Sequence, residues 1–292
     1  VGVLSFRRFA STNESAESDP EKNSCKANTT TTTSPKKITL RVLFYIFLVI
    51  AVIVLAILIV FKLQGKFIYF PVARKYVSPT FPHEDLWLKS ADGTKINAMY
   101  VPPDSKFNRS SPIYAIIFHH GTTGYEQVEI SNMRQALIER GLNVAFMVPS
   151  YRGYGKSDKA PEEIGINHDA KKCFDWFKLK MDTDYGVNAY KLVVYGISLG
   201  GAVTIDLVSK NSSEVTGMII ENTFTTMHDL IQSVVHPITK HVPEFFTEKF
   251  ESIKKIGSIN KKVKVLVLTG MKDALIPPTH SSKLVEQLKE NG

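Results

Sequence analysis

Apolar residues are distributed unevenly along the chain. Between Val42 and Phe61 twenty consecutive residues carry no charge and are mostly Leu, Ile, Val and Phe. As a helix, such a run is long enough to cross about 30 Å of hydrocarbon. Before it, residues 11–37 hold almost no large apolar side chain and include five consecutive threonines. The pattern therefore predicts four parts: a disordered polar tail (1–41), a transmembrane helix (42–61), a juxtamembrane stalk (62–83) and a folded domain (84–292).

In the folded domain, short apolar runs alternate with stretches of helical spacing. The first two runs, Glu84–Ser90 and Lys95–Val101, are joined by Asp92-Gly93 and predict an antiparallel hairpin. The later runs are almost wholly apolar, which is typical of parallel strands covered on both faces: 113–118, 144–148, 192–195, 218–220 and 263–268. Helices are expected near 126–140, 169–181, 200–210 and 279–290. This alternation predicts an α/β fold, a mostly parallel sheet with helices on both faces and functional loops at its carboxyl edge.

The formal charge of +8 does not indicate a polyanion partner. Residues 1–41 carry seven basic and four acidic groups, and residues 62–292 carry 29 and 24. Because no dense basic face results, we expect no nucleic acid partner. Cys25 and Cys173 lie on opposite sides of the predicted membrane helix and cannot pair within one chain, and Cys173 is expected in the core. The sequence has no C-x-x-C motif and no His/Cys cluster, so we expect no metal and no cofactor.

The orientation of the membrane helix is not decided by its flanking charges, since basic residues lie on both sides. A short tail before one long apolar segment is the usual arrangement of a signal anchor. We therefore expect a single-pass type II protein of an endomembrane or the plasma membrane, with its large domain outside the cytosol. Sequons at Asn108 and Asn211 are candidate glycosylation sites in that topology, although Asn13 and Asn28 head sequons on the other side.

A serine nucleophile is predicted at Ser198. Residues 196–200 read Gly-Ile-Ser-Leu-Gly, between an apolar strand and a helical pattern. In that context the serine lies on a tight turn between strand and helix, where glycines remove side chains that would clash with the backbone. The alternative is a chance match in an ordinary glycine turn. The helix beginning at Leu199 directs unpaired N–H groups at the same place, which suits the oxyanion of acyl transfer.

A second loop supplies a further oxyanion donor. His119-His120-Gly121-Thr122 follows the strand at 113–118, and its glycine allows the backbone to approach a ligand closely. We expect the N–H groups of Thr122 and Leu199 to form the oxyanion hole, each worth about 3 kcal/mol of transition-state stabilisation. The alternative is a turn that only begins a helix. His120 is expected to orient this loop rather than act as a base.

The candidate acid is Asp273, which follows the last apolar strand directly. Its carboxylate would orient a histidine and stabilise the charged imidazole, and Glu221 is the reserve candidate. The order Ser, Asp, His is that of α/β-hydrolases. No histidine follows at the expected distance, however, because His280 is only seven residues after Asp273 and the other histidines precede it. We therefore expect this chain to lack a complete triad and to be inactive as it stands.

Tyr151-Arg-Gly-Tyr-Gly-Lys-Ser157 has the end of a phosphate-binding loop but not its beginning. Ser150 occupies the position where the first glycine would be required. We expect no nucleotide, and interpret the glycines as a tight turn beneath the active site.

Six motifs together resemble the membrane-anchored Bem-type branch of the α/β-hydrolases. They are Phe67-Ile-Tyr-Phe-Pro71, Phe118-His-His-Gly121, Tyr151–Ser157, Gly196-Ile-Ser-Leu-Gly-Gly-Ala-Val203, Glu221-Asn-Thr-Phe224 and Gly270-Met-Lys-Asp-Ala-Leu-Ile-Pro-Pro278. The resemblance implies a single-pass anchor and a serine-hydrolase domain, with the nucleophile at Ser198 and the acid at Asp273. It also implies a histidine roughly thirty residues after the acid, past Gly292. Thr122-Thr123 replace the Asn-Ala usual in this family.

These features predict a membrane-anchored serine hydrolase that cleaves an ester or thioester through an acyl-enzyme. An apolar insertion at 223–262 is where this fold often builds a lid, which favours a lipid ester or acylated protein as substrate. The alternative is that its apolar residues are ordinary core. A serine peptidase of the same fold is a second hypothesis, and a non-catalytic membrane scaffold is a third.

Overall fold

The computed structural model describes residues 35–71, 79–108, 111–123, 126–234 and 247–290. The chain divides into two units, residues 1–54 and 55–292, and each is treated by itself. Most of the predicted tail lies outside the described residues. So do 72–78 of the predicted stalk and 235–246 of the predicted lid-like insertion.

Helix α1 (Pro35–Ile68) contains the predicted membrane span. Thr39–Val60 is long and apolar enough to cross a membrane, and its apolar side chains are exposed rather than packed. This agrees with the span predicted from Val42 to Phe61. The helix continues to Ile68, because no proline interrupts it before Pro71. The first residues of the predicted stalk are therefore helical.

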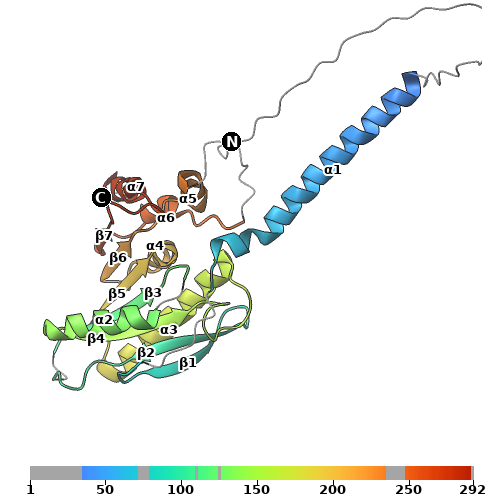
Figure 1. Ribbon diagram of the computed structural model, residues 1–292. Helices are drawn as coiled ribbons and strands as arrows, with labels where there is room; N and C mark the ends of the chain where they lie inside the picture. The colour runs from blue at the N-terminus through green and yellow to red at the C-terminus, as the bar shows by residue number, and fades with distance from the viewer. Residues whose placement is uncertain (1–34, 72–78, 109–110, 124–125, 235–246, 291–292) are drawn as a thin grey trace, which may run out of the picture. The chain divides into compact units, whose positions relative to one another are not determined.

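Seven strands form one sheet in the order β1-β2-β4-β3-β5-β6-β7, with β1 at one edge and β7 at the other (Figure 1). The strands are β1 (Glu84–Lys89), β2 (Lys95–Val101), β3 (Ile113–His119), β4 (Asn143–Ser150), β5 (Tyr190–Ile197), β6 (Gly217–Glu221) and β7 (Lys264–Leu268). β2 pairs antiparallel with β1 and β4, and the remaining pairs are parallel. The predicted hairpin and mostly parallel sheet are confirmed.

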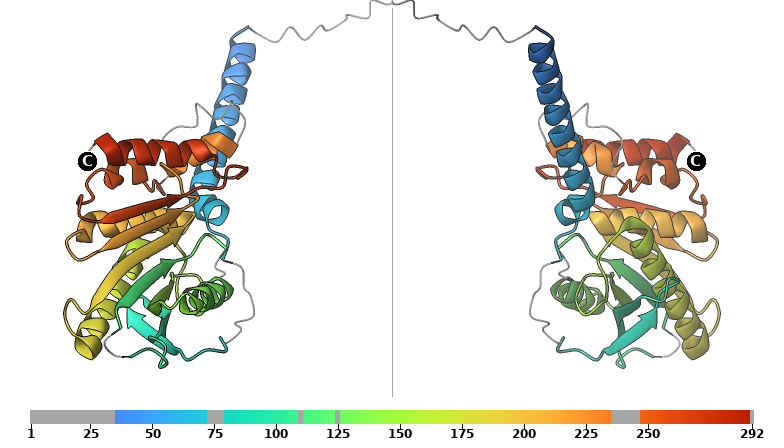
Figure 2. Two further views of the ribbon diagram at one scale, coloured as in Figure 1. Left: turned by 90° about the vertical axis from the view of Figure 1, so that its left-hand side faces the viewer. Right: turned by 90° about the vertical axis from the view of Figure 1, so that its right-hand side faces the viewer.

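Helices cover both faces of the sheet. They are α2 (Glu126–Glu139), α3 (Glu163–Tyr185), α4 (Leu199–Asn211), α5 (Met227–Val234), α6 (Ser252–Ile256) and α7 (Pro278–Glu290). Ala115 and Ile117 of β3 pack with α3 and α4, whereas Ile116 and Phe118 pack with α2. Figure 2 shows α2 on the opposite side of the strands from α3. This alternation is the period of two that places successive side chains on opposite faces, and Cys173 of α3 is in the core as predicted.

Helix α3 begins six residues before its predicted start, at Glu163. The reason is a distant partner: the Glu248 carboxylate accepts the N–H of Glu163 at 2.6 Å. Glu163 in turn accepts the N–H groups of Lys249 and Phe250 at 2.6 and 2.9 Å. A carboxylate at a helix N-terminus compensates its unpaired donors and its dipole. The helix start therefore depends on a contact that local sequence does not contain.

Arg152 is a buried link between the hairpin, β4 and α3. Its side chain is 1% exposed and forms ion pairs with Asp169 at 2.9 Å, Asp92 at 3.0 Å and Glu162 at 3.2 Å. A Cβ on Gly165 would collide with this guanidinium. The motif at 151–157 is thus a structural turn, with Gly153 at φ 78° and Gly155 at φ 55°.

Phe224, Met227 and Phe250 of the predicted lid-like insertion are buried in a cluster with Tyr151 and Leu199. For these three residues the structure supports the alternative of ordinary core. Leu230 and Ile231 are partly buried against the same cluster.

Candidate active site

Ser198 lies at the corner between β5 and α4 with φ 54° and ψ −120°. A non-glycine residue at positive φ is strained by about 1–3 kcal/mol and is maintained only by its surroundings. The Ser198 N–H donates to the Glu221 carbonyl at 2.9 Å, and the Thr223 hydroxyl donates to the Ser198 carbonyl at 2.8 Å. The backbone of the predicted nucleophile is therefore held on both sides by the residues that follow β6.

Glycines make this corner possible. A Cβ on Gly196 would collide with the Gly200 carbonyl, and a Cβ on Gly200 would collide with the His119 carbonyl oxygen. A Cβ on Gly201 would collide with Thr223. The close approach of three backbone segments around Ser198 therefore requires G-x-S-x-G-G, as in a nucleophile turn.

The loop after β3 lies against Ser198. A Cβ on Gly121 would be 3.4 Å from the Ser198 Cβ, so the backbone just before Thr122 passes close to the predicted nucleophile. The carbonyl of Thr122 accepts the Tyr154 hydroxyl at 3.1 Å. Leu199 is the first residue of α4, so its N–H has no partner within the helix. The loop and the helix start are the two segments from which the predicted oxyanion donors come.

Asp273 lies in the loop after β7 and is partly buried. Its Oδ1 accepts the N–H groups of Leu275 and Ile276, both at 2.9 Å. The loop is joined to the end of β6 through Asn222, whose Oδ1 accepts the Gly270 N–H at 2.6 Å. Since Ser198 is bonded to the neighbouring Glu221, the predicted acid lies at the same carboxyl edge of the sheet as the predicted nucleophile.

The carboxylate of Glu221, the reserve acid, accepts a hydrogen bond from the Tyr195 hydroxyl. Burial and this bond raise the pKa of Tyr195 above its usual range. Sequence reasoning did not identify the neighbours Asn222 and Thr223 as site residues. Their signal was present in Glu221-Asn-Thr-Phe224, one of the family motifs.

In the part of the chain that the structure describes, no histidine bonds Ser198 or Asp273. His280 is buried, its Nδ1 is 3.0 Å from the Thr225 hydroxyl, and burial lowers its pKa. His119 is fully buried with Nδ1 2.8 Å from the Thr204 hydroxyl. The His120 ring packs on Tyr151 with its Nδ1 2.7 Å from the Gly121 carbonyl, and its role in orienting the loop stays a prediction.

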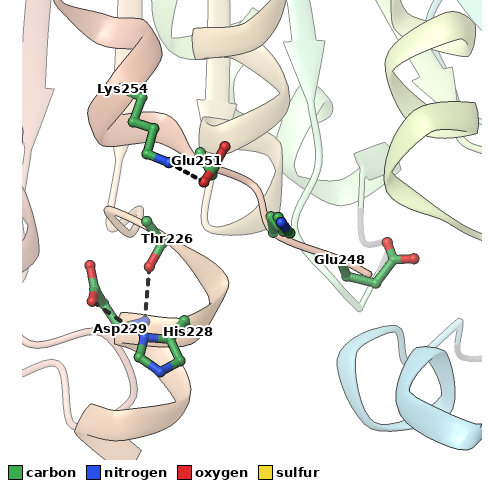
Figure 3. Close-up of a pocket in the computed structure, with 7 residues that line it drawn as sticks. Thr226, His228, Asp229, Glu248, Glu251 and Lys254 are labelled. Atoms are coloured by element: carbon green, nitrogen blue, oxygen red, sulfur yellow. Dashed lines mark hydrogen bonds and ion pairs between the residues drawn. The ribbon is translucent and has the colours of Figure 1, made fainter. Parts of the chain in front are cut away.

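A cavity of about 270 Å³ lies between α5 and the segment before α6 (Figure 3). Its lining is charged and mostly paired within itself, for example Glu251 with Lys254 at 2.5 Å. Ser198 and Asp273 do not line it. This cavity is therefore separate from the candidate catalytic residues. Over the described ranges, no group of three His, Cys, Asp or Glu residues could hold a metal ion.

The two candidate glycosylation sites differ in their surroundings, and both stay predictions. Asn211 is 7% exposed at the end of α4, and its Nδ2 donates to the Leu207 carbonyl at 2.7 Å. A glycan would have to replace that bond and occupy packed space. Asn108 is exposed and stays a prediction.

Comparison with known proteins places this geometry in a family. Residues 129–292 match the model of the prolyl oligopeptidase family. Protein bem46 of Schizosaccharomyces pombe is 31% identical over 238 residues, 78% of this chain and 76% of that protein. WAV2, an α/β-hydrolase domain-containing protein of Arabidopsis thaliana, is 31% identical over 260 residues, 83% of this chain and 80% of that protein.

A third relative, the uncharacterized membrane protein YNL320W of Saccharomyces cerevisiae, is 32% identical and covers 70% of this chain and 68% of its own length. Among solved structures, the Pyrococcus furiosus esterase Pf2001 aligns with a TM-score of 0.57 at 18% identity, over 76% of this chain and 84% of that chain. An α/β-hydrolase from Vibrio vulnificus aligns with a TM-score of 0.56 at 20% identity, over 72% of this chain and 70% of that chain. The two solved structures are similar to this chain in fold, and the three relatives are similar to it in sequence. The chain therefore belongs to the Bem46-type family of α/β-hydrolases.

Proposed function

We propose that this protein is a membrane-anchored serine hydrolase that cleaves an ester or thioester through an acyl-enzyme. The observation that carries the proposal is Ser198 itself, a serine held at φ 54° between β5 and α4 where any larger neighbour at 196 or 200 would collide with the backbone. Strain of this kind is concentrated at functional sites. A structural role alone would be served as well by glycine.

In the proposed reaction, Ser198 Oγ attacks the acyl carbon and the carbonyl oxygen becomes an oxyanion. The N–H groups of Thr122 and Leu199 stabilise that charge, as two aligned donors do in this type of site. The leaving alcohol or thiol departs with a proton, and water then attacks the acyl-enzyme. Asp273, held through one oxygen by two backbone N–H groups, orients the histidine that moves the proton. No described histidine is in place, so the proposal assigns that role to a residue outside the described part of the chain.

The proposed substrate is a lipid ester or an acylated protein. The apolar span of α1 precedes the hydrolase unit directly, so the site is tethered to a chain segment suited to a bilayer. A signal anchor places the hydrolase unit on the non-cytosolic side in this proposal. A peptidase is the second candidate, because the carboxyl-terminal half matches the prolyl oligopeptidase family.

The test is labelling of the full-length protein in membranes with a fluorophosphonate probe, which traps activated serines. We expect Ser198→Ala to abolish labelling, while Ser258→Ala, at an exposed serine after α6, leaves it intact. Labelling that persists at another serine in Ser198→Ala would contradict the assignment. Matched ester and amide substrates of one acyl group separate the two candidates, since an esterase turns over only the ester at an appreciable rate.

A further inference from the structure

We propose that the juxtamembrane end of α1 is part of the active-site machinery. Through the Thr122 hydroxyl it fixes the loop whose backbone supplies an oxyanion donor. This inference rests on the proposed function and deepens it, by making Thr122 a positioning residue as well as a backbone donor.

The Thr122 side chain bonds directly to the end of the helix. Its hydroxyl donates to the Ile68 carbonyl at 2.7 Å and accepts the Phe70 N–H at 3.4 Å. Ile68 is the last residue of α1, so its carbonyl is one of those that a helix leaves without an internal partner. On the other side, the Tyr154 hydroxyl holds the Thr122 carbonyl. The side chain and the carbonyl of Thr122 are thus held from two directions, which restrains the backbone of the loop at the residue that supplies the proposed N–H donor.

The segment that holds Thr122 is itself fixed to the hydrolase unit. Tyr69 is 2% exposed, its hydroxyl donates to Glu248, and its ring packs edge-on against Phe250 with centroids 6.4 Å apart. One turn earlier, Gln64 Oε1 accepts the Thr247 N–H at 3.0 Å. The segment is therefore an anchored part of the fold rather than a free stalk.

These contacts form a continuous path. It runs from the start of α3 through Glu248 to Tyr69, along the helix end to Thr122, and through Gly121 to Ser198. Loss of the Thr122 hydroxyl leaves the backbone donor present but less well directed. Complete loss of an oxyanion donor typically costs a factor of 10²–10³ in kcat, so misdirection of one should cost about tenfold.

Thr122→Val tests this directly, because valine keeps the branched shape and the backbone N–H and removes only the hydroxyl. With a short-chain p-nitrophenyl ester and the full-length protein in membranes, we expect kcat to fall about tenfold and KM to stay within about twofold. Thr122→Ser, which restores a hydroxyl, should recover most of the turnover. The matched control is Thr183→Val, which removes a similar 2.8 Å bond to the Leu179 carbonyl on the exposed side of α3 and should leave kcat unchanged.

Tyr69→Phe provides an independent variant that does not touch the loop. It removes the bond to Glu248 and should lower kcat several-fold at constant KM, even if Thr122→Val folds poorly. Unchanged kcat in both Thr122→Val and Tyr69→Phe would overturn the inference, and so would an equal loss in Thr122→Ser and Thr122→Val. Ser198→Ala in the same assay separates failure of the proposed serine mechanism from failure of the role assigned to the helix end. If it is as active as the wild type, the serine mechanism fails, whereas an inactive Ser198→Ala beside a fully active Thr122→Val overturns only the role of the helix end.

Discussion

Single atoms decide the geometry around Ser198. The turn brings the His119 carbonyl, the start of α4 and the end of β6 so close together that no side chain fits at 196, 200 or 201. Because the interior is packed this closely, an added side chain would displace the neighbouring backbone segments. Substitutions at these glycines should therefore alter both the fold and the proposed nucleophile.

Gly200→Ala should destabilise the protein by about 3 kcal/mol or more, because the new Cβ would collide with the His119 carbonyl oxygen. The measurement is chemical unfolding of the detergent-solubilised protein. Gly217→Ala is the control, since its Cβ would be 3.4 Å from the nearest atom, the Lys264 carbonyl oxygen. Equal stability of the two variants would show that the turn can relax, and the strain argument would then fail.

His119 should make the protein sensitive to acid. Burial, and then the neighbouring His120, lower the pKa of His119 from 6.5 to about 3. Between these values the unfolded chain binds a proton that the folded protein does not, so the free energy of unfolding falls as the pH falls. The slope from this residue is at most about 1.4 kcal/mol per pH unit, and it vanishes above pH 6.5.

The check is urea unfolding at several pH values between 7 and 4 for wild type and His119→Gln. We expect a shallower pH dependence in His119→Gln, whereas His168→Gln, at an exposed histidine of α3, should follow the wild type. Parallel curves for all three proteins would mean that His119 does not carry the acid sensitivity.

At the scale of elements, most of the architecture could be predicted from local pattern. The seven strands and the helices α2, α4 and α7 agree with the expected ranges within a few residues, because buried parallel strands read as apolar runs and these helices show their own spacing. The short helices α5 and α6 lie where no separate helix was expected. The start of α3 could not be predicted, since its partner Glu248 is 85 residues away.

The candidate site divides in the same way. Ser198 could be proposed because its turn motif is made of neighbouring residues. Asp273 could be proposed because a loop that follows a parallel strand lies at the carboxyl edge of the sheet. The bond from Thr122 to Ile68 spans 54 residues and joins two predicted parts of the chain, so no local pattern encodes it. The burial of Asn211 could not be predicted either. A sequon is a pattern of three residues and contains no information on how the end of α4 packs.

Arg152 joins three elements, and its loss should be costly. Arg152→Met leaves Asp169, which is completely buried, without its cation and should destabilise the protein by about 3–5 kcal/mol. The measurement is chemical unfolding, with Arg140→Met as the control because Arg140 is exposed and its guanidinium donates to the Ala136 carbonyl in the last turn of α2. Adding Asp169→Asn to Arg152→Met should recover part of the loss. A cost below about 1 kcal/mol for Arg152→Met would contradict the role assigned to this link.

At the scale of the whole molecule, the proposed topology predicts which parts a protease can reach. In sealed microsomes, residues 84–292 should resist digestion until detergent is added, because a signal anchor places them in the lumen. Digestion without detergent would reverse the orientation.

The two sequons offer a matched second measurement of the same topology. Asn108→Gln should increase electrophoretic mobility by removing a glycan from an exposed loop, and Asn211→Gln should not, because Asn211 is buried. A mobility change in Asn211→Gln alone would contradict the burial argument.

The position of β7 at the end of the sheet has a consequence for the colloidal behaviour of the protein. One side of this strand has no partner strand among the described residues, and Leu266 is 50% exposed on one of its faces. An open strand edge with apolar side chains can template pairing between copies, and a lysine on the edge opposes it through charge repulsion. Lys264, exposed on the same face as Leu266, is the described residue placed to do this. A chain of residues 1–292 should therefore become turbid more readily as salt screens that charge.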